Sequence, residues 1–222
     1  MLKVYDKLKE WMRRSVDMLH LGIDIDGTIT AQDTFVPYLN ESFSLSITLD
    51  DIKDYDLTKL LNISDEDFWK WMNENEPRIY QEALLAQYAK QTLDELKQQH
   101  RLIYITARRN HLKDITFNWF RQHNIHYDHI ELVGGHDKLE AVLKHGIDVF
   151  FEDHHGNATM IAKEADIPVL LFNTPYNQLP SDSNIIRVNS WLEAADWLRK
   201  NKKYLEYKKK HVSQTYMLFL QV

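Results

Sequence analysis

The chain has 222 residues, of which 44% are hydrophobic, and a formal net charge of −6. This length allows one large domain, or a core domain with an insertion, that buries a substantial core. The lack of cysteine excludes disulfides and thiolate metal sites and favours the cytoplasm. The negative charge argues against a nucleic acid polymer as partner. No apolar run reaches the roughly 20 residues that a membrane span requires.

Residues 1–19 are predicted to form an amphipathic helix. Apolar residues such as Leu8 and Trp11 recur at helical spacing, and lysine, aspartate, glutamate and arginine interrupt them. That pattern does not match a signal peptide. We expect the helix to dock on a neighbouring core, and attachment to a membrane surface is the alternative.

Residues 32–95 form a predicted helical insertion, because no convincing strand occurs between Gln32 and His100. Ser64, followed three residues later by Asp67, resembles a capping box and predicts a helix start. Glu76 and Pro77 predict the start of another helix, which continues to about residue 99 with leucines at helical spacing.

The rest of the chain, residues 20–31 and 96–222, is predicted to be an α/β core. Short apolar runs alternate with amphipathic segments, and the connections between them are short. This pattern predicts a Rossmann-like parallel sheet with helices on both faces. The predicted strands lie within 21–25, 101–106, 129–133, 147–153 and 167–173, and the predicted helices within 111–123, 136–146, 158–166 and 190–210.

Polar side chains follow several of the predicted strands at the point where each strand ends. Because ligands bind at the carboxyl ends of the strands of a parallel sheet, we expect these side chains to converge on one edge. They are Asp24, Asp26, Thr106, Lys138, Glu152 and Asp153. A β-hairpin at Asp26-Gly27 is the alternative explanation of the first two, but it does not account for the others.

This set of side chains indicates phosphoryl chemistry at a hard cation. Several carboxylates without cysteine suit Mg²⁺, and a cation held by carboxylates, together with Lys138 and Thr106, would bind an anionic phosphoryl group. Asp24 is then placed to attack phosphorus, and Asp26 to act as general acid and base. Gly27 lets the backbone turn sharply close to the phosphate.

Four stretches of the sequence resemble the four ordered motifs of the haloacid dehalogenase superfamily of phosphatases: "DIDGT" from Asp24, "YIT" ending in Thr106, Lys138, and "FFED" ending in Asp153. The resemblance implies that Asp24 is the nucleophile and Asp26 the general acid/base. It also implies that Thr106, with its neighbour Ala107, and Lys138 bind phosphate. The carboxylates of Asp24 and Asp153 and the backbone carbonyl of Asp26 would hold Mg²⁺, with Glu152 as a helper. At the position of Glu152, the superfamily commonly has a second aspartate. Receiver domains of response regulators use a similar set, but there the acidic pair comes first and the lysine last.

The position of the insertion, between the first two predicted core strands, is where this superfamily carries a small helical cap. With "DIDGTITAQDTFVPYLN", "YITAR" and "FFEDHHGNA", the chain resembles the 5′(3′)-deoxyribonucleotidase branch, which implies a Mg²⁺-dependent phosphatase acting on nucleoside monophosphates. Candidate substrate contacts are Phe35, Trp69 and Arg108. Aromatic side chains of the insertion could instead form its own core, and Arg108 a surface ion pair. Another phosphometabolite as substrate, and a non-catalytic phosphate- or nucleotide-binding module, are the alternative functions.

Other polar segments are not assigned to the site. We expect the histidine-rich stretch 123–129 to be a solvated loop and the basic stretch 199–211 to be the solvated face of the last helix. Histidines 154 and 155 follow the acidic pair, and a supporting role at the metal or the substrate is one interpretation of them.

Overall fold

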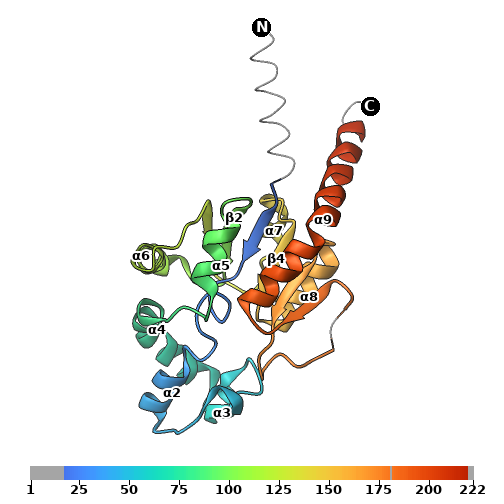
Figure 1. Ribbon diagram of the computed structural model, residues 1–222. Coiled ribbons are helices and arrows are strands. Elements are labelled where there is room, and N and C mark those ends of the chain that lie inside the picture. Colours follow the sequence, from blue (N-terminus) through green and yellow to red (C-terminus); the bar gives the residue numbers. More distant parts are fainter. Residues whose placement is uncertain (1–17, 181, 220–222) are drawn as a thin grey trace.

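The protein, described here from a computed structural model, is built on one parallel sheet (Figure 1). The structure describes residues 18–180 and 182–219, so the predicted helix 1–19 lies almost wholly outside the described residues. Within them the strands are β1 (His20–Ile23), β2 (Arg101–Thr106), β3 (His129–Leu132), β4 (Val149–Glu152), β5 (Val169–Phe172) and β6 (Ile185–Val188). Their order in the sheet is β3-β2-β1-β4-β5-β6, and every pair is parallel.

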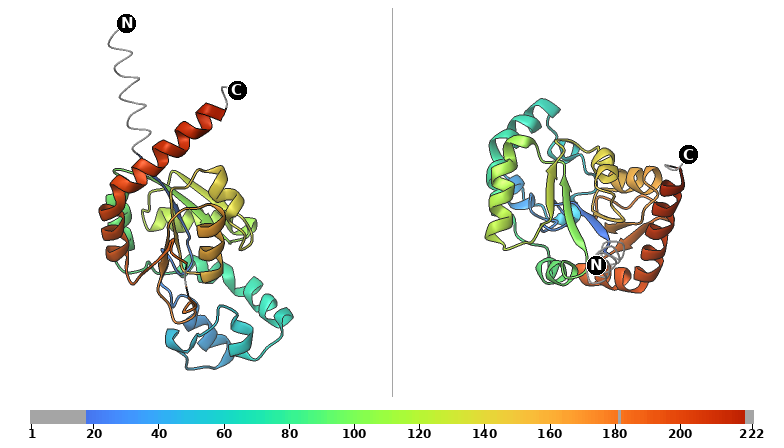
Figure 2. Two further views of the ribbon diagram at one scale, coloured as in Figure 1. Left: turned by 90° about the vertical axis from the view of Figure 1, so that its right-hand side faces the viewer. Right: turned by 90° about the horizontal axis from the view of Figure 1, so that it is seen from above.

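Helices cover both faces of the sheet, as predicted (Figure 2). The α-helices are α2 (Val36–Phe43), α3 (Leu57–Leu61), α4 (Asp65–Glu82), α5 (Ala89–Leu96), α6 (Lys113–Gln122), α7 (Leu139–Lys144), α8 (His155–Glu164) and α9 (Trp191–Phe219). Two 3₁₀ turns are η1 (Leu49–Asp51) and η2 (Asn110–Leu112). One core cluster joins α5, α6 and α9 to the sheet, and a second joins α7 and α8 to its other face.

The helical insertion has a third core of its own. Helices α2, α3 and α4 lie together at one end of the sheet, while α9 extends past the other end (Figure 1). Their cluster includes Leu39, Trp71 and Ile79, which are buried against one another. The two connections to the sheet run side by side, because Ala31 N–H donates to the Leu84 carbonyl at 2.8 Å and Ala86 N–H to that of Ile29 at 2.9 Å.

Three details of the sequence prediction are corrected by the structure. No helix starts at Glu76 and Pro77, because both lie inside α4. That helix ends before Ala83, and α5 is a separate helix. The predicted insertion boundary at residue 95 is too late, since Ala89 and Leu93 of α5 already pack in the core of the sheet. Strand β6 was not predicted, because "IIRV" is short and carries an arginine. The capped start at Ser64 is confirmed: its hydroxyl accepts the Asp67 N–H at 3.1 Å.

The first strand does not lead into a hairpin. β1 pairs only with β2 and β4 among the described strands, both in parallel, and Asp24 N–H continues the ladder to the Phe151 carbonyl at 3.0 Å. The turn that follows is closed by N–H groups of Ile29 and Thr30, which both donate to the Ile25 carbonyl at 3.0 Å. The hairpin interpretation of Asp26-Gly27 is therefore wrong, and the turn delivers both aspartates to the carboxyl edge of the sheet.

Candidate active site

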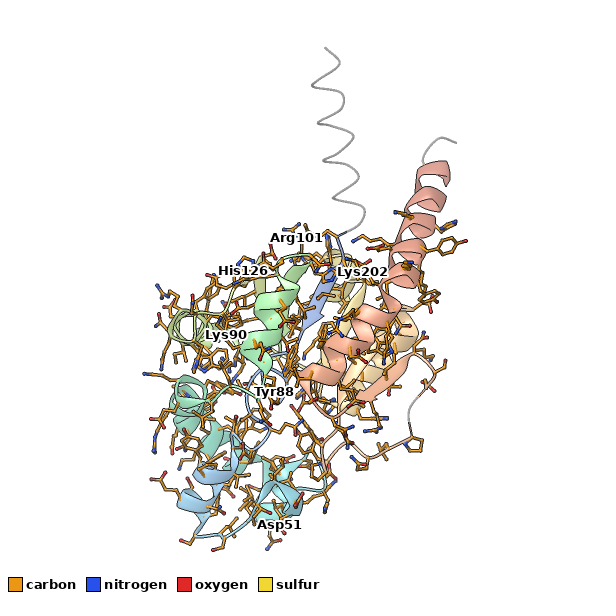
Figure 3. All side chains as sticks on the ribbon, in the orientation of Figure 1. Asp51, Tyr88, Lys90, Arg101, His126 and Lys202 are labelled. Carbon is orange, nitrogen blue, oxygen red and sulfur yellow. The ribbon has the colours of Figure 1, made fainter. Side chains whose placement is uncertain are left out.

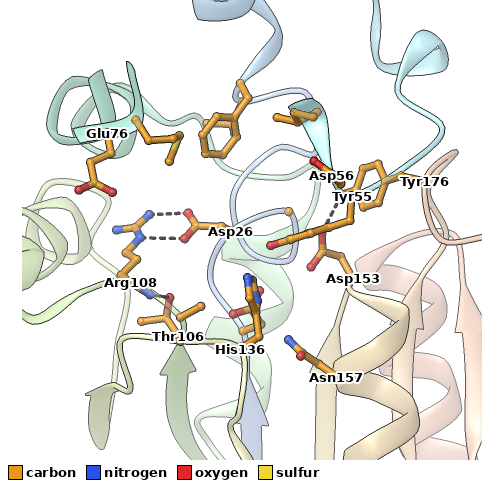
Figure 4. Close-up of a pocket in the computed structure, with 18 of the residues that line it drawn as sticks. Asp26, Tyr55, Asp56, Glu76, Thr106, Arg108, His136, Asp153, Asn157 and Tyr176 are labelled. Atoms are coloured by element: carbon orange, nitrogen blue, oxygen red, sulfur yellow. Dashed lines mark hydrogen bonds and ion pairs between the residues drawn. The ribbon is translucent and has the colours of Figure 1, made fainter. Parts of the chain in front are cut away.

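The carboxyl ends of β1, β2 and β4 bring the predicted polar side chains to one edge, where the helical insertion faces them. A cavity of about 660 Å³ lies there, a size typical of small-molecule sites. Its walls come from both parts of the chain (Figure 4). The core contributes Asp24, Asp26, Thr106, Ala107, Lys138, Glu152 and Asp153, and the insertion contributes Phe35, Tyr55, Trp69, Met72 and Glu76, among others.

Lys138 lies at the centre of the buried charges. Its ammonium group donates to Asp24 Oδ1 at 2.5 Å and to Glu152 Oε2 at 3.0 Å, and the lysine is 1% exposed. Burial disfavours its charged form, but the negative charges of Asp24 and Glu152 outweigh this and raise the pKa of Lys138. The lysine therefore remains a cation that ties the ends of β1 and β4 together.

Asp24, Glu152 and Asp153 form a buried all-oxygen group, and their carboxylate oxygens lie within 4.8 Å of one another. Burial raises the pKa of Asp24 to about 7, with Lys138 opposing this shift, and burial together with Asp24 and Glu152 raises the pKa of Asp153 well above its ordinary value. Three carboxylates so close together repel one another as anions, so a cation among them would stabilise the charged forms. Oxygen donors alone are what Mg²⁺ prefers.

Gly27 lies against this group. Its φ is +77°, and a Cβ atom built on it would lie only 2.2 Å from Asp153 Oδ2. Only glycine combines that backbone angle with so close an approach. The sequence predicted a sharp turn at this residue; the structure adds that the missing side chain makes room for Asp153.

Hydrogen bonds from side chains that the sequence analysis did not identify hold the acidic pair in place. Asn157 Nδ2 donates to Glu152 Oε1 at 2.6 Å, and the Tyr176 hydroxyl donates to Asp153 Oδ2 at 2.6 Å. Asn177 Nδ2 donates to the backbone carbonyl of Asp153 at 2.7 Å. Tyr176 and Asn177 follow β5, so the strand-end rule, applied to that strand as well, would have found them.

Thr106 and Asp26 lie on the other side of the site. Thr106 is 1% exposed and its hydroxyl accepts the Arg108 N–H at 3.2 Å. Arg108 Nε and Nη2 donate to the two carboxylate oxygens of Asp26, at 2.9 and 2.7 Å. Arg108, the candidate substrate contact, lines the cavity, but its guanidinium is directed at Asp26. The alternative interpretation, a surface ion pair, is wrong, since the arginine side chain is fully buried.

The aromatic side chains of the insertion divide into two groups. Phe35, Phe43, Phe68 and Trp71 belong to the core of the insertion, as the alternative interpretation held, although Phe35 also reaches the cavity. Trp69 is 51% exposed and lines the cavity. Tyr55 lies over the acidic group with its ring edge-on to that of His154, at 4.1 Å between centroids (Figure 4).

The histidines that the sequence analysis singled out make contacts of their own. His154 Nδ1 accepts the Asn157 N–H at the start of α8, and burial lowers the pKa of His154 to about 4. His155 contacts the Pro180 carbonyl. In Figure 3, His126 lies near Arg101 at the end of the sheet opposite Asp51. The stretch 123–129 was expected to be a solvated loop, but His129 lies close to Glu131 and His145 in a group that could hold a metal ion. Lys144 already donates to both Glu131 oxygens, at 2.9 and 3.2 Å.

Comparison with known proteins shows the family to which the chain belongs. Residues 17–204 match the family model described as 5′ nucleotidase, deoxy (pyrimidine), cytosolic type C protein. The chain belongs to this nucleotidase family. It is 75% identical over 188 residues to YqfW of Bacillus subtilis (strain 168), whose name marks it as a candidate nucleotidase, covering 85% of this chain and 97% of that one. It is 33% identical over 178 residues to a nucleotidase of Clostridium acetobutylicum, covering 80% and 92%.

Solved structures with the same fold are haloacid dehalogenase-like hydrolases. The haloacid dehalogenase-like family protein SP0104 from Streptococcus pneumoniae has a TM-score of 0.58 at 16% identity. The match covers 82% of this chain and 99% of SP0104. YfnB from Bacillus subtilis, solved with magnesium, has a TM-score of 0.56 at 14% identity and covers 82% and 98%. The predicted fold is thus confirmed, and the enzyme is a phosphoric monoester hydrolase of the nucleotidase family.

The search for membrane-crossing segments covers the described residues. Among them, no helix combines the length and the apolar character that crossing a bilayer demands.

Proposed function

We propose that this nucleotidase hydrolyses nucleoside monophosphates, deoxynucleotides among them, with Mg²⁺ and through a phosphorylated Asp24. The observation that carries the proposal is the buried group of Asp24, Glu152 and Asp153 around Lys138 at the edge of the cavity. The cavity, at about 660 Å³, has room for a nucleotide-sized ligand. The family description names cytosolic proteins, and we extend that location to this chain.

The metal would be held by Asp24, Asp153 and Glu152, with the backbone carbonyl of Asp26 as a further oxygen. The donor set supports Mg²⁺, as does the magnesium in the YfnB structure, which has the same fold. When bound, Mg²⁺ would neutralise negative charge on the phosphoryl oxygens. Lys138 adds a fixed positive charge beside Asp24, and the Thr106 hydroxyl and the backbone of Ala107 offer hydrogen bonds to the same oxygens.

The reaction would proceed in two displacements. In the first, a carboxylate oxygen of Asp24 attacks phosphorus, the bond from phosphorus to the substrate oxygen breaks, and Asp26 donates a proton to that oxygen. In the second, water attacks the acyl-phosphate and Asp26 takes up its proton. Inorganic phosphate leaves, and the Asp24 carboxylate is restored.

The role of Asp24 is tested by Asp24→Asn. The amide is a poor nucleophile, so turnover of a nucleoside monophosphate should fall at least about a thousandfold. Phosphate release with Mg²⁺ measures it, and Asp33→Asn, which changes an exposed aspartate of the same loop, is the control. An Asp24→Asn enzyme that retains most of its activity would contradict the phospho-enzyme mechanism.

The substrate class is tested with a panel of ribo- and deoxyribonucleoside monophosphates and phosphosugars. We expect nucleotides to have the highest kcat/KM, because Trp69 and Tyr55 present aromatic surfaces to the cavity on which a base can stack. Faster hydrolysis of phosphosugars would support the other phosphometabolite class. Binding without release would support a non-catalytic module, against which the family membership already argues.

A further inference from the structure

Arg108 is the buried cation that the proposed reaction leaves without a role. Its Nε and Nη2 donate to the two oxygens of Asp26 in a two-pronged contact, at 2.9 and 2.7 Å, and its side chain is fully buried while that of Asp26 is 24% exposed. A planar guanidinium that meets both oxygens of a carboxylate fixes the plane of that carboxylate as well as its position. Asp26 lies on a turn before Gly27, and no other side chain of the described residues hydrogen-bonds to its carboxylate.

Side chains from two other elements hold Arg108 in place. Nη1 donates to the Thr116 hydroxyl of α6 at 3.2 Å, and the guanidinium carbon lies 4.1 Å from the centre of the Tyr80 ring of α4. The next residue, Arg109, contacts Asn73 and the buried Glu76 of the same α4 helix. Two consecutive arginines therefore link the helical insertion to the loop after β2. One of them, Arg108, also contacts Asp26 (Figure 4).

We propose that Arg108 is the positioning residue for Asp26, and that Tyr80 makes this positioning depend on the docked helical insertion. The inference rests on the proposed function, because it takes Asp26 as the group that moves the proton. Arg108 stays protonated and cannot move that proton itself. By holding the Asp26 carboxyl in one orientation, it aims one oxygen at the place where the leaving oxygen is released.

Positioning of a general acid has a signature that a purely structural role lacks. An alkoxide leaving group, such as the 5′ oxygen of a nucleoside, needs a proton as its bond to phosphorus breaks. The p-nitrophenolate ion is stable without one. Misplacing Asp26 should therefore slow the first displacement much more with a nucleoside monophosphate than with p-nitrophenyl phosphate, whereas general loss of structure would slow both alike. The second displacement, in which Asp26 takes a proton from water, is shared by the two substrates, so the quantity to compare is kcat/KM, which reports the first displacement.

The experiment measures kcat and KM of Arg108→Met with deoxyuridine monophosphate and with p-nitrophenyl phosphate, under saturating Mg²⁺. We expect kcat/KM on the nucleotide to fall about 100-fold or more, with less than about a fivefold fall on the aryl phosphate. Arg108→Lys keeps the charge but loses the two-pronged contact, so it should rescue only part of the difference. In an Asp26→Asn background, Arg108→Met should add little further loss.

Two control variants isolate the contact. Arg109→Met removes an arginine of the same loop that does not touch Asp26, and it should leave the ratio of the two rates unchanged. Tyr80→Phe keeps the ring beside Arg108 and should keep the wild-type ratio, while Tyr80→Leu removes the ring and should shift the ratio in the direction of Arg108→Met. If Arg108→Met does not fold, as judged by circular dichroism, Arg108→Lys and Tyr80→Leu decide the test.

Equal losses of kcat/KM on both substrates in Arg108→Met would overturn the inference, and so would a loss on the nucleotide that lies entirely in KM, which would make Arg108 a substrate-binding group. Failure of the proposed function gives a different result. A wild-type enzyme that releases phosphate from neither substrate, or an active Asp24→Asn enzyme, would contradict the proposed reaction before Arg108 is considered.

Discussion

Gly27 shows at the level of one residue how two acidic segments, far apart in the chain, come within reach of one cation. Its φ of +77° turns the chain after Asp26, and its lack of a side chain lets Asp153 Oδ2 approach its Cα. Asp153 also accepts the Tyr176 hydroxyl, so its carboxylate is held on a second side. The sequence predicted the turn from "DG", but not the neighbour, because a contact across 126 residues is not encoded in local pattern.

Replacing Gly27 with alanine should weaken metal binding before it abolishes the fold. The new methyl group would require a positive φ and would displace Asp153, so the Mg²⁺ concentration for half-maximal activity should rise at least about tenfold. A Mg²⁺ titration of phosphate release measures this. Gly135→Ala is the matched control, since a Cβ there meets no atom within 4 Å. An unchanged Mg²⁺ requirement in Gly27→Ala would show that Asp153 is not a metal ligand.

At the scale of elements, Asn177 joins the ends of β4 and β5. Its Nδ2 donates to the backbone carbonyls of Asp153 and Phe172, each at 2.7 Å, and its Oδ1 accepts from Arg187 Nη1 at 2.9 Å. The residue is 1% exposed, and Asp153 and Phe172, whose carbonyls it binds, are each 4% exposed. It therefore fixes the strand ends on which the acidic pair is carried.

Asn177→Ala should lower the free energy of unfolding by about 2 to 3 kcal/mol, because two carbonyl groups would be left buried and unpaired. Denaturant unfolding followed by circular dichroism measures the loss. Asn173→Ala, which removes the side chain of an exposed asparagine on the same connection, should change stability by less than about 0.5 kcal/mol. Equal effects of the two substitutions would show that Asn177 does not bridge the strands.

The helices and strands that sequence reasoning predicted correctly share a physical feature: each has an apolar pattern of its own. Strands β2 and β4 are almost continuous apolar runs, and α9 is an uninterrupted helical pattern. The errors lie where tertiary contacts decide. Pro77 continues α4 rather than starting a helix, and β6 exists because it pairs with β5 and buries Ile185 and Val188 at one edge of the sheet.

For the whole molecule, the sequence predicted which polar side chains gather at the edge of the sheet but not the groups that support them. The strand-end rule brings Asp24, Thr106 and Asp153 to one edge from topology alone. The supporting groups, Asn157, Tyr176 and Arg108, depend on side-chain orientation, which no short motif encodes. The same limit applied to Arg108, which the sequence suggested as a substrate contact and which is buried against Asp26.

A buried histidine outside the site makes the stability of the whole molecule depend on pH. His100, just before β2, is 7% exposed, and its Nδ1 has no hydrogen-bond partner among the residues that the structure describes. Burial, together with the nearby charges of Lys202 and Lys209, lowers its pKa from 6.5 to about 4. The unfolded chain therefore binds a proton more readily than the folded one between these two values. The contribution of His100 to stability is complete above pH 6.5 and is lost as the pH falls toward 4.

Between pH 7.5 and pH 5, this difference amounts to about 2 kcal/mol of unfolding free energy. His100→Gln cannot take up the proton, so its stability should fall less than that of the wild type over this range. Urea unfolding at the two pH values measures both, and comparing the variant with the wild type removes the contribution of every other titrating group. His126→Gln, at an exposed histidine near the same end of the sheet, should follow the wild-type pH dependence. Parallel pH profiles for wild type and His100→Gln would mean that His100 is protonated as readily in the folded chain as in the unfolded one.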